Sequence, residues 1–232
     1  MILENKTVIA IIPARFGSKR IKKKNLKSFC GKPLFLWTVM ASKKSKLIDK
    51  VLVTSDSRKI LSQAKKVKVD FCQLRNKKLS SDKATSWNVV RDSLEFLSKK
   101  GYLFDYFVML QPTSPLRTQI HIDNCLTKLR PQDTGIVSIT ESQKPLEWMA
   151  RLNKQKNFLS FAHGLKNNKL KKKKSYLING AIYAFKTKEI YKKNFIFKKS
   201  VNLFFMDHKF SIDIDTQEEF KIAEFYKRCR KL

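Results

Sequence analysis

The stretch Val8-Ile9-Ala10-Ile11-Ile12-Pro13-Ala14-Arg15-Phe16-Gly17-Ser18-Lys19-Arg20 decides the fold of this chain. It opens with five apolar residues, which is typical of a buried strand. The run ends at a proline, and a polar loop with one glycine and three basic side chains follows directly. A buried strand that runs into such a loop is typical of an α/β sheet with parallel strands.

Short apolar strands and amphipathic helices alternate through the first half of the chain. Strands are expected at Val8–Ile12, Lys50–Thr54, Val69–Gln73, Asp105–Leu110 and Gly135–Thr140. Helices are expected at Leu34–Lys44, Arg58–Lys66, Ser86–Lys99 and Thr118–Leu129. This order predicts a doubly wound, mainly parallel α/β sheet with helices on both faces.

The alternation stops near Glu141. Two strand-like runs within Pro145–Phe161 and a polar, lysine-rich stretch at His163–Lys174 indicate an excursion from the main sheet. The chain then returns to the core through a strand at Gly180–Phe185, a run at Val201–Met206 and a helix at Thr216–Arg230. On that helix Phe220, Ile222, Ala223 and Phe225 are expected to face inward. The 232 residues therefore suit one domain, 1–232, with 141–178 as an appendage.

The net charge of +31 is concentrated in two blocks, since residues 1–50 hold 13 Lys and Arg against 2 acids and residues 151–200 hold 15 against 1. A basic RNA-binding protein is one interpretation. It predicts aromatic side chains exposed among the basic ones, whereas most aromatics here fall at periodic core positions. A codon bias toward AT-rich triplets would also give many lysines. A positive field would in addition speed the association of anionic substrates with an enzyme.

No apolar run approaches the roughly 20 residues that a membrane span needs. The start MILENKTVIAIIPAR has neither the basic first segment nor the cleavage site of a signal peptide. We therefore expect a cytoplasmic protein with no membrane partner. The four cysteines, Cys30, Cys72, Cys125 and Cys229, form no C-x-x-C pair and are expected to be reduced, structural thiols.

The loop after the first strand is the first place to look for a ligand, because open parallel sheets bind ligands beyond the carboxyl ends of their strands. Residues 13–20 are followed by Lys22, Lys23, Lys24 and Asn25. A glycine lets backbone N–H groups curl around phosphate oxygens, a serine adds a donor, and the cations neutralise a triphosphate. The pattern predicts a phosphate-binding loop without the P-loop NTPase motif, and a solvated basic turn is the alternative.

Paired carboxylates stand near the C-terminus, in Ser211-Ile212-Asp213-Ile214-Asp215-Thr216. In an extended segment, residues two apart point to the same face, so Asp213 and Asp215 are predicted to lie together. Mg²⁺ prefers such hard oxygen ligands, completed by substrate phosphates and water. The alternative is that Asp215 or Thr216 only caps the final helix, with Glu218 or Glu219 completing a capping box.

Two further loops follow predicted strands. In Gln111-Pro112-Thr113-Ser114-Pro115-Leu116-Arg117, two prolines fix the chain and hold Gln111 as a polar group suited to sugar recognition. The loop from Leu74-Arg75 to Ser86 offers donors for a base edge and a ribose. Taken alone, each segment is also an ordinary turn or loop.

Taken together and in this order, these segments resemble the acylneuraminate cytidylyltransferases, or CMP-sialic acid synthetases. The resemblance covers nearly the whole chain and rests on I-I-P-A-R-x-G-S-K-R, Lys24-Asn25, G-K-P-L at 31–34, T-S-D at 54–56, L-Q-P-T-S-P-L-R at 110–117, N-G-A-I-Y at 179–183 and S-I-D-I-D-T at 211–216. It implies a Rossmann-like nucleotidyltransferase that transfers CMP from CTP to the anomeric hydroxyl of a sialic-acid-like nonulosonic acid and releases pyrophosphate. Legionaminate-, pseudaminate- and Kdo-type acids are the alternative acceptors.

The resemblance also implies roles for particular residues. Arg15, Gly17, Ser18, Lys19, Lys24 and Asn25 would hold CTP, with Arg75 and Ser86 at the base end. Gln111 would contact the sugar acid and Asn179 would bind substrate. Asp213 and Asp215 would be catalytic and bind Mg²⁺, with Lys24 and Lys169 as further catalytic groups. The hydroxyl proton would pass either to Asp213 or to a water polarised by the cation.

Residues 141–178 match the dimerisation or lid excursion of the family, so the resemblance implies a homodimer. The product would serve cell-surface polysaccharide biosynthesis. The chain departs from the family at Phe16, which replaces a small residue, and before Asn179, where the lysines within 169–174 and Leu177 stand in place of arginines. Lysine lacks the bidentate fork of arginine, so this departure bears on the choice of acceptor.

Overall fold

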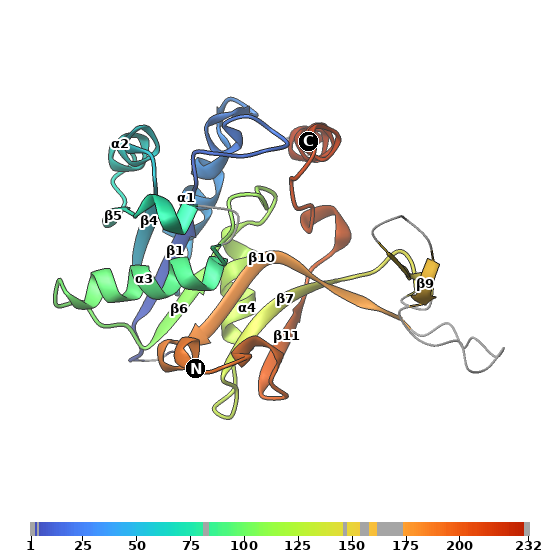
Figure 1. The fold of residues 1–232 in the computed structure, drawn as a ribbon. Helices are drawn as coiled ribbons and strands as arrows, with labels where there is room; N and C mark the ends of the chain where they lie inside the picture. The colour runs from blue at the N-terminus through green and yellow to red at the C-terminus, as the bar shows by residue number, and fades with distance from the viewer. Residues whose placement is uncertain are drawn as a thin grey trace.

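The computed structural model describes residues 3, 5–80, 84–145, 148–153, 158–161 and 174–229. Its centre is a seven-stranded sheet with the strand order β11-β7-β10-β6-β1-β4-β5 (Figure 1). The strands are β1 (Val8–Pro13), β4 (Lys50–Ser55), β5 (Phe71–Leu74), β6 (Tyr106–Met109), β7 (Gly135–Glu141), β10 (Tyr176–Lys186) and β11 (Val201–Phe205). β10 runs antiparallel to both β6 and β7, and the other pairs are parallel. The prediction of a mainly parallel α/β sheet is confirmed.

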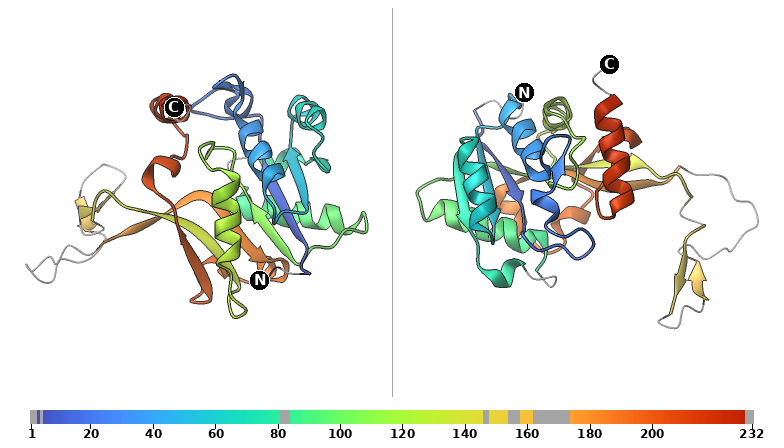
Figure 2. Two further views of the ribbon diagram at one scale, coloured as in Figure 1. Left: turned by 180° about the vertical axis from the view of Figure 1, so that it is seen from behind. Right: turned by 90° about the horizontal axis from the view of Figure 1, so that it is seen from above.

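Helices cover both faces of the sheet (Figure 2). One face packs against α1 (Leu34–Lys44), α2 (Arg58–Lys66) and α4 (Gln119–Thr127), and the other packs against α3 (Ser86–Ser98). Alternate residues of β1 point to opposite faces, so Ala10 and Ile12 join the first core while Ile9 and Ile11 join the second. All four are fully buried, which explains the continuous apolar run at Val8–Ile12.

The last helix, α5 (Gln217–Arg228), closes a smaller third core. Phe220 and Ala223 are buried there as expected, with Phe220 packed edge-to-face on Phe29 at 5.5 Å between ring centroids. Ile222 and Phe225, however, are 48% and 64% exposed, so the expectation that both face inward is wrong. Residues three apart share a helix face, whereas residues two or five positions from Phe220 point well away from it.

The excursion after β7 leaves the body of the molecule as an arm (Figures 1 and 2). Its two strand-like runs are confirmed as an antiparallel pair, β8 (Ala150–Leu152) and β9 (Phe158–Phe161). β10 begins at Tyr176, before the expected Gly180, and its first three residues pair with residues 139–141 at the outer end of β7. The register shifts between Ile178 and Tyr183, so β10 holds an irregular segment where it re-enters the main sheet.

Short elements complete the fold: the β2–β3 pair (Ser28–Phe29 and Lys32–Pro33) and the 3-10 turns Lys24–Leu26, Lys77–Ser80, Thr187–Tyr191, Phe195–Phe197 and His208–Phe210. Among the described residues, no helix combines the length and the apolar character needed to cross a membrane. All four cysteines are free thiols, as expected. Burial raises the pKa of Cys125, which makes that thiol inert.

Gly135 makes the pairing of β7 with β10 possible. It lies opposite Phe185, and a Cβ at this position would collide with the Phe185 ring and lie 2.6 Å from the Ala184 carbonyl oxygen. We expect Gly135→Ala to lower the free energy of unfolding by about 2 kcal/mol or more, because one contact is with backbone that cannot give way locally. Urea denaturation measures this loss. A urea midpoint for Gly135→Ala equal to that of wild type would show that β10 can move away from the added methyl group without loss of stability.

Candidate active site

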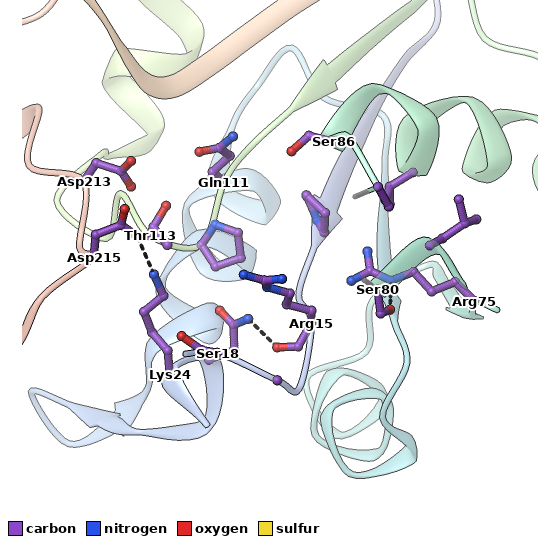
Figure 3. Close-up of a pocket in the computed structure, with 17 residues that line it drawn as sticks. Arg15, Ser18, Lys24, Arg75, Ser80, Ser86, Gln111, Thr113, Asp213 and Asp215 are labelled. Carbon is purple, nitrogen blue, oxygen red and sulfur yellow. Dashed lines mark hydrogen bonds and ion pairs between the residues drawn. The ribbon is translucent and has the colours of Figure 1, made fainter. Parts of the chain in front are cut away.

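A cavity of about 310 Å³ opens where the parallel strands end at one edge of the sheet. This edge is where an open parallel sheet binds its ligands. Ten of the residues expected at a site line it: Arg15, Gly17, Ser18, Lys24, Asn25, Arg75, Ser86, Gln111, Asp213 and Asp215. Figure 3 shows Asp213, Asp215 and Lys24 on one side of the cavity, Arg75 and Ser80 on the opposite side, and Arg15 between them.

The loop after β1 is held in shape from three directions. The Ala14 N–H donates to the Thr54 carbonyl at 2.9 Å, and the Phe16 N–H donates to the Asp56 carboxylate at 2.8 Å. Asn25 Nδ2 donates to the Arg15 carbonyl at 2.7 Å. Asn25 Oδ1 is buried without a hydrogen-bond partner among the described residues, so a donor on a ligand would satisfy it.

Lys24 joins this loop to the paired aspartates. Its side chain is 10% exposed, and Nζ donates to the Ile214 carbonyl at 2.6 Å and to Asp215 Oδ1 at 3.0 Å. Arg20 Nη1 reaches the other oxygen of Asp215 at 2.8 Å. Burial of Asp215 opposes its ionisation, but the hydrogen bonds and charges of Lys24 and Arg20 outweigh it and hold the pKa of Asp215 below its usual range.

The neighbouring carboxylate of Asp213 is shifted in the opposite direction. Surrounding protein atoms desolvate it and raise its pKa; a hydrogen bond from the Thr113 side chain opposes this shift, and the charge of Asp215 adds to it. The two carboxylates therefore differ in proton affinity although they are two residues apart. Such a pair can hold one ionised group and one group poised to accept a proton.

Gln111 reaches the same place from the end of β6. The Ile214 N–H donates to the Thr113 carbonyl at 2.8 Å, which ties the loop after Gln111 to the segment of both aspartates. Gly180 faces Gln111 across the sheet with a φ of +76°, and a Cβ there would lie 3.1 Å from Gln111 Oε1 and 3.7 Å from Asp213 Oδ2. Only glycine leaves this space and adopts this backbone conformation without strain.

Arg75 defines the far end of the cavity. It is 6% exposed, and its Nε donates to Ser80 Oγ at 2.9 Å. Burial lowers the pKa of Arg75, although the Asp56 and Asp92 carboxylates act against this shift. Its Nη1 is buried and has no hydrogen-bond partner among the described residues, so an acceptor on a ligand would satisfy it.

Three expected residues are placed differently. Lys19 does not line the cavity, although it belongs to the same loop. Asn179 lines a different cavity, and its amide is bonded inside the protein: Oδ1 accepts from Ser138 Oγ at 2.5 Å and from the Ala181 N–H at 3.1 Å, and Nδ2 donates to Ser211 Oγ at 2.9 Å. Lys169 lies outside the described residues. The roles of all three remain predictions.

Sequence reasoning missed three residues that shape the cavity. Thr113 lines it beside Gln111 and hydrogen-bonds Asp213, Asp56 fixes the loop after β1, and Arg117 lies buried behind Gln111. All three belong to motifs that the sequence analysis identified: Thr113 and Arg117 to L-Q-P-T-S-P-L-R, and Asp56 to T-S-D. Their positions after buried strands are the signal that assigns them to this edge of the sheet.

The cavity suits a hard divalent cation in part. Asp213 and Asp215 both present carboxylate oxygens to it. Within the described part of the chain, no three His, Cys, Asp or Glu side chains are grouped to hold a metal. A cation at this pair would therefore need substrate oxygens and water for its remaining ligands, as Mg²⁺ commonly does.

The Cytidylyltransferase family model matches residues 9–232. The chain belongs to the cytidylyltransferase family. It is similar to an N-acylneuraminate cytidylyltransferase of Escherichia coli, with 32% identity over 219 residues that cover 93% of this chain but 51% of that protein. It is also similar to a pseudaminic acid cytidylyltransferase of Campylobacter jejuni, with 30% identity over 218 residues that cover 93% of this chain and 94% of the relative.

The same fold is found in a solved structure of CMP:2-keto-3-deoxy-manno-octonic acid synthetase complexed with CTP. The TM-score is 0.71 at 16% sequence identity, and the match covers 97% of this cytidylyltransferase and all of that chain. The chain spans about half the length of the E. coli relative and nearly all of the C. jejuni one. The region that the chain shares with the E. coli relative is therefore part of a longer protein there.

The opposite pKa shifts predict opposite effects on stability. Asp215→Asn leaves the nearly buried Lys24 ammonium without its carboxylate, so we expect a loss of about 1 kcal/mol after solvent screening. The depressed pKa means that ionised Asp215 stabilises the fold above the ordinary aspartate pKa of about 4, and that this contribution disappears as pH falls through the folded pKa. The difference between wild type and Asp215→Asn should therefore shrink in acid.

Asp213→Asn is the matched control for this prediction. Because the pKa of Asp213 is raised, its ionised form costs the folded state stability at neutral pH, and the amide removes that cost. Thermal unfolding without ligands should give a Tm for Asp213→Asn no lower than that of wild type. If this variant were the less stable of the two, the assignment of the shifts would be wrong.

Proposed function

We propose that this cytidylyltransferase transfers CMP from CTP to the anomeric hydroxyl of a sialic-acid-type nonulosonic acid and releases pyrophosphate. The observation that carries the proposal is that Arg15, Lys24 and Arg75 line the same cavity as the pair Asp213 and Asp215. Family membership supports the cytidylyl transfer, and the names of the two relatives support a nine-carbon acid as acceptor.

The cavity orients the nucleotide by charge. Arg15, the open backbone at Gly17 and Ser18, and Lys24 form a cationic wall that fits a triphosphate. The buried Nη1 of Arg75, which has no partner among the residues that the structure describes, fits an acceptor on the base at the other end. The reacting α-phosphorus would then lie between Arg15 and the two aspartates, next to Gln111.

In the proposed reaction the anomeric oxygen attacks the α-phosphorus in line, a new P–O bond forms, and the bond to pyrophosphate breaks. Lys24 and Arg15 stabilise the charge that develops on the transferred group and on the leaving group. Asp213 lies beside Gln111 in the cavity and is placed to accept the hydroxyl proton. When bound at Asp213 and Asp215, Mg²⁺ would neutralise phosphate charge and polarise the attacked group.

The choice of acceptor is open between sialic acid and its relatives. Gln111 is the polar group that would contact the acid beside Asp213. Leu177 stands where arginines are expected from the resemblance, and it pairs with Thr140 and lines a second cavity of about 430 Å³ next to Asp213. An apolar side chain there offers no carboxylate contact, so a legionaminate-, pseudaminate- or Kdo-type acid is the second candidate.

We propose further that the chain acts as a homodimer in the cytoplasm. Large apolar side chains are exposed on the arm, at its base and on the neighbouring edge strand: Trp148, Leu152, Tyr176, Leu177, Ile178, Leu203 and Phe205. Tyr176 and Phe205 pack edge-to-face, which joins β10 and β11 into one surface. A patch of this kind favours contact with a second copy, and the free cysteines fit a reducing compartment.

The reaction is tested by pyrophosphate release from each NTP with a panel of 3-deoxy sugar acids, with and without Mg²⁺. We expect turnover with CTP and one nonulosonic acid, and dependence on the cation. Asp213→Asn, which should fold normally, is expected to lose turnover by about 100-fold or more. No turnover above background with CTP and any acid would refute the proposal.

The dimer is tested by light scattering after size exclusion. Leu203→Glu with Phe205→Glu places two charges on the exposed surface of β11, and we expect the mass to fall from that of two chains to that of one. Phe225→Glu is the matched control, because Phe225 is as exposed but lies on α5, outside the patch. A dimeric double variant would show that this surface is not the interface.

A further inference from the structure

Arg117 is the most deeply buried cation among the described residues, with 2% of its surface exposed. It lies at the end of the loop that begins with Gln111, and it does not line the cavity. No described carboxylate forms an ion pair with it. Burial of a charge without a counter-ion is costly, and it lowers the pKa of Arg117 to about 9. Such a group is retained only where its hydrogen bonds are needed.

The guanidinium of Arg117 joins three elements. Nη1 donates to the Ala181 carbonyl at 2.7 Å and to the Gln111 carbonyl at 3.2 Å, and Nη2 donates to Thr38 Oγ1 on α1 at 2.6 Å. Thr38 Oγ1 in turn lies 3.5 Å from the Gln111 carbonyl. One planar side chain thus connects the end of β6, the middle of β10 and a helix behind the sheet.

The strand ladder supplies neither carbonyl with a donor; the Gln111 carbonyl also accepts the Ser114 N–H of its own turn at 3.3 Å, so Arg117 is needed most by the Ala181 carbonyl. The regular pairing of β6 with β10 runs from Met109 with Tyr183 to Tyr106 with Lys186, and it stops just before Gln111 and Ala181. On the other side of β10, the pairing with β7 is interrupted between Ile178 and Tyr183. Buried carbonyls at such a break must find partners outside the ladder, and Arg117 supplies two of them with a donor.

We infer that Arg117 is a positioning residue for the sugar acid: it fixes the separation of Gln111 from Gly180-Ala181 and so sets where the Gln111 amide meets the acceptor. The fit there is close, because a Cβ at Gly180 would lie 3.1 Å from Gln111 Oε1 and 3.7 Å from Asp213 Oδ2. A small change in this separation would move Gln111 relative to Asp213. The inference rests on the proposed function for the contact of Gln111 with the acid.

The test compares Arg117→Lys and Arg117→Met with wild type in steady-state kinetics. Lysine keeps the charge but cannot reach three acceptors on three elements, and methionine removes the donors. We expect the KM for the acid to rise about tenfold in Arg117→Lys and further in Arg117→Met, while the KM for CTP stays within about twofold. Equal changes in both KM values, or no change, would overturn the inference.

Arg91→Lys is the matched control. Arg91 is a part-buried arginine on α3 whose Nη2 donates to the Ile190 carbonyl at 3.0 Å, away from the cavity. Replacing its guanidinium by the ammonium of Arg91→Lys should leave the KM for the acid unchanged. The same rise in Arg91→Lys would show that the Arg117 effect is only a general loosening of the fold.

A double-mutant cycle asks whether Arg117 acts through Gln111. In a Gln111→Ala background the side chain to be positioned is gone, so adding Arg117→Lys should change kcat/KM for the acid by less than about twofold. A full additional loss would overturn the inference.

Hydrogen exchange gives a readout that needs no turnover. The backbone amides of residues 111–117 and 179–183 should exchange faster in Arg117→Lys than in wild type, while those of α3 should exchange at the same rate. Unchanged exchange at those amides would overturn the inference even if the proposed reaction itself fails.

Discussion

The parallel pairing of β1 with β4 on one side and β6 on the other is the constraint on which the rest of the structure depends. It aligns the three strand ends, so the loops that carry Arg15, Asp56 and Gln111 leave the sheet at one edge. Both faces of β1 are buried, so its side chains pack into a core on each side of the sheet. The cavity therefore exists because the core exists, and its geometry follows from strand pairing rather than from the loops alone.

The charges at this edge are arranged at a cost to the ligand-free protein. Asp213 resists ionisation, and within the described part of the chain Arg75 keeps a buried donor without a partner and Asn25 keeps a buried acceptor without one. Asp215 is satisfied by Lys24 and Arg20 instead. Groups of this kind are left unsatisfied where a ligand completes them, and a polyanion with a base and hydroxyls has the donors and acceptors to do so. The high net charge adds a long-range attraction for such a substrate.

β10 supplies the backbone that lies beside Gln111 and Asp213. Because it runs antiparallel between β6 and β7, it brings Gly180 against Gln111, and its outer end continues into the arm. In its irregular segment, Arg117 donates to the Ala181 carbonyl, and Ser138 Oγ accepts the Ile182 N–H and donates to the Ile182 carbonyl. The same strand thus extends from the cavity to the exposed apolar surface that we assign to a second copy.

The sequence by itself determined the sheet, the order of its helices, the family and ten of the residues that line the cavity. Those features depend on local patterns: an apolar run buried on both faces, the helical period, and polar loops directly after strands. The tertiary structure alone decided the direction of β10, the different proton affinities of Asp213 and Asp215, the internal use of Asn179 and the burial of Arg117. Each of these depends on which distant segments meet, and neither the spacing of residues nor their chemical type specifies that. Ile222 and Phe225 are exposed for the same reason, because an apolar residue on a helix is buried only where another element covers it.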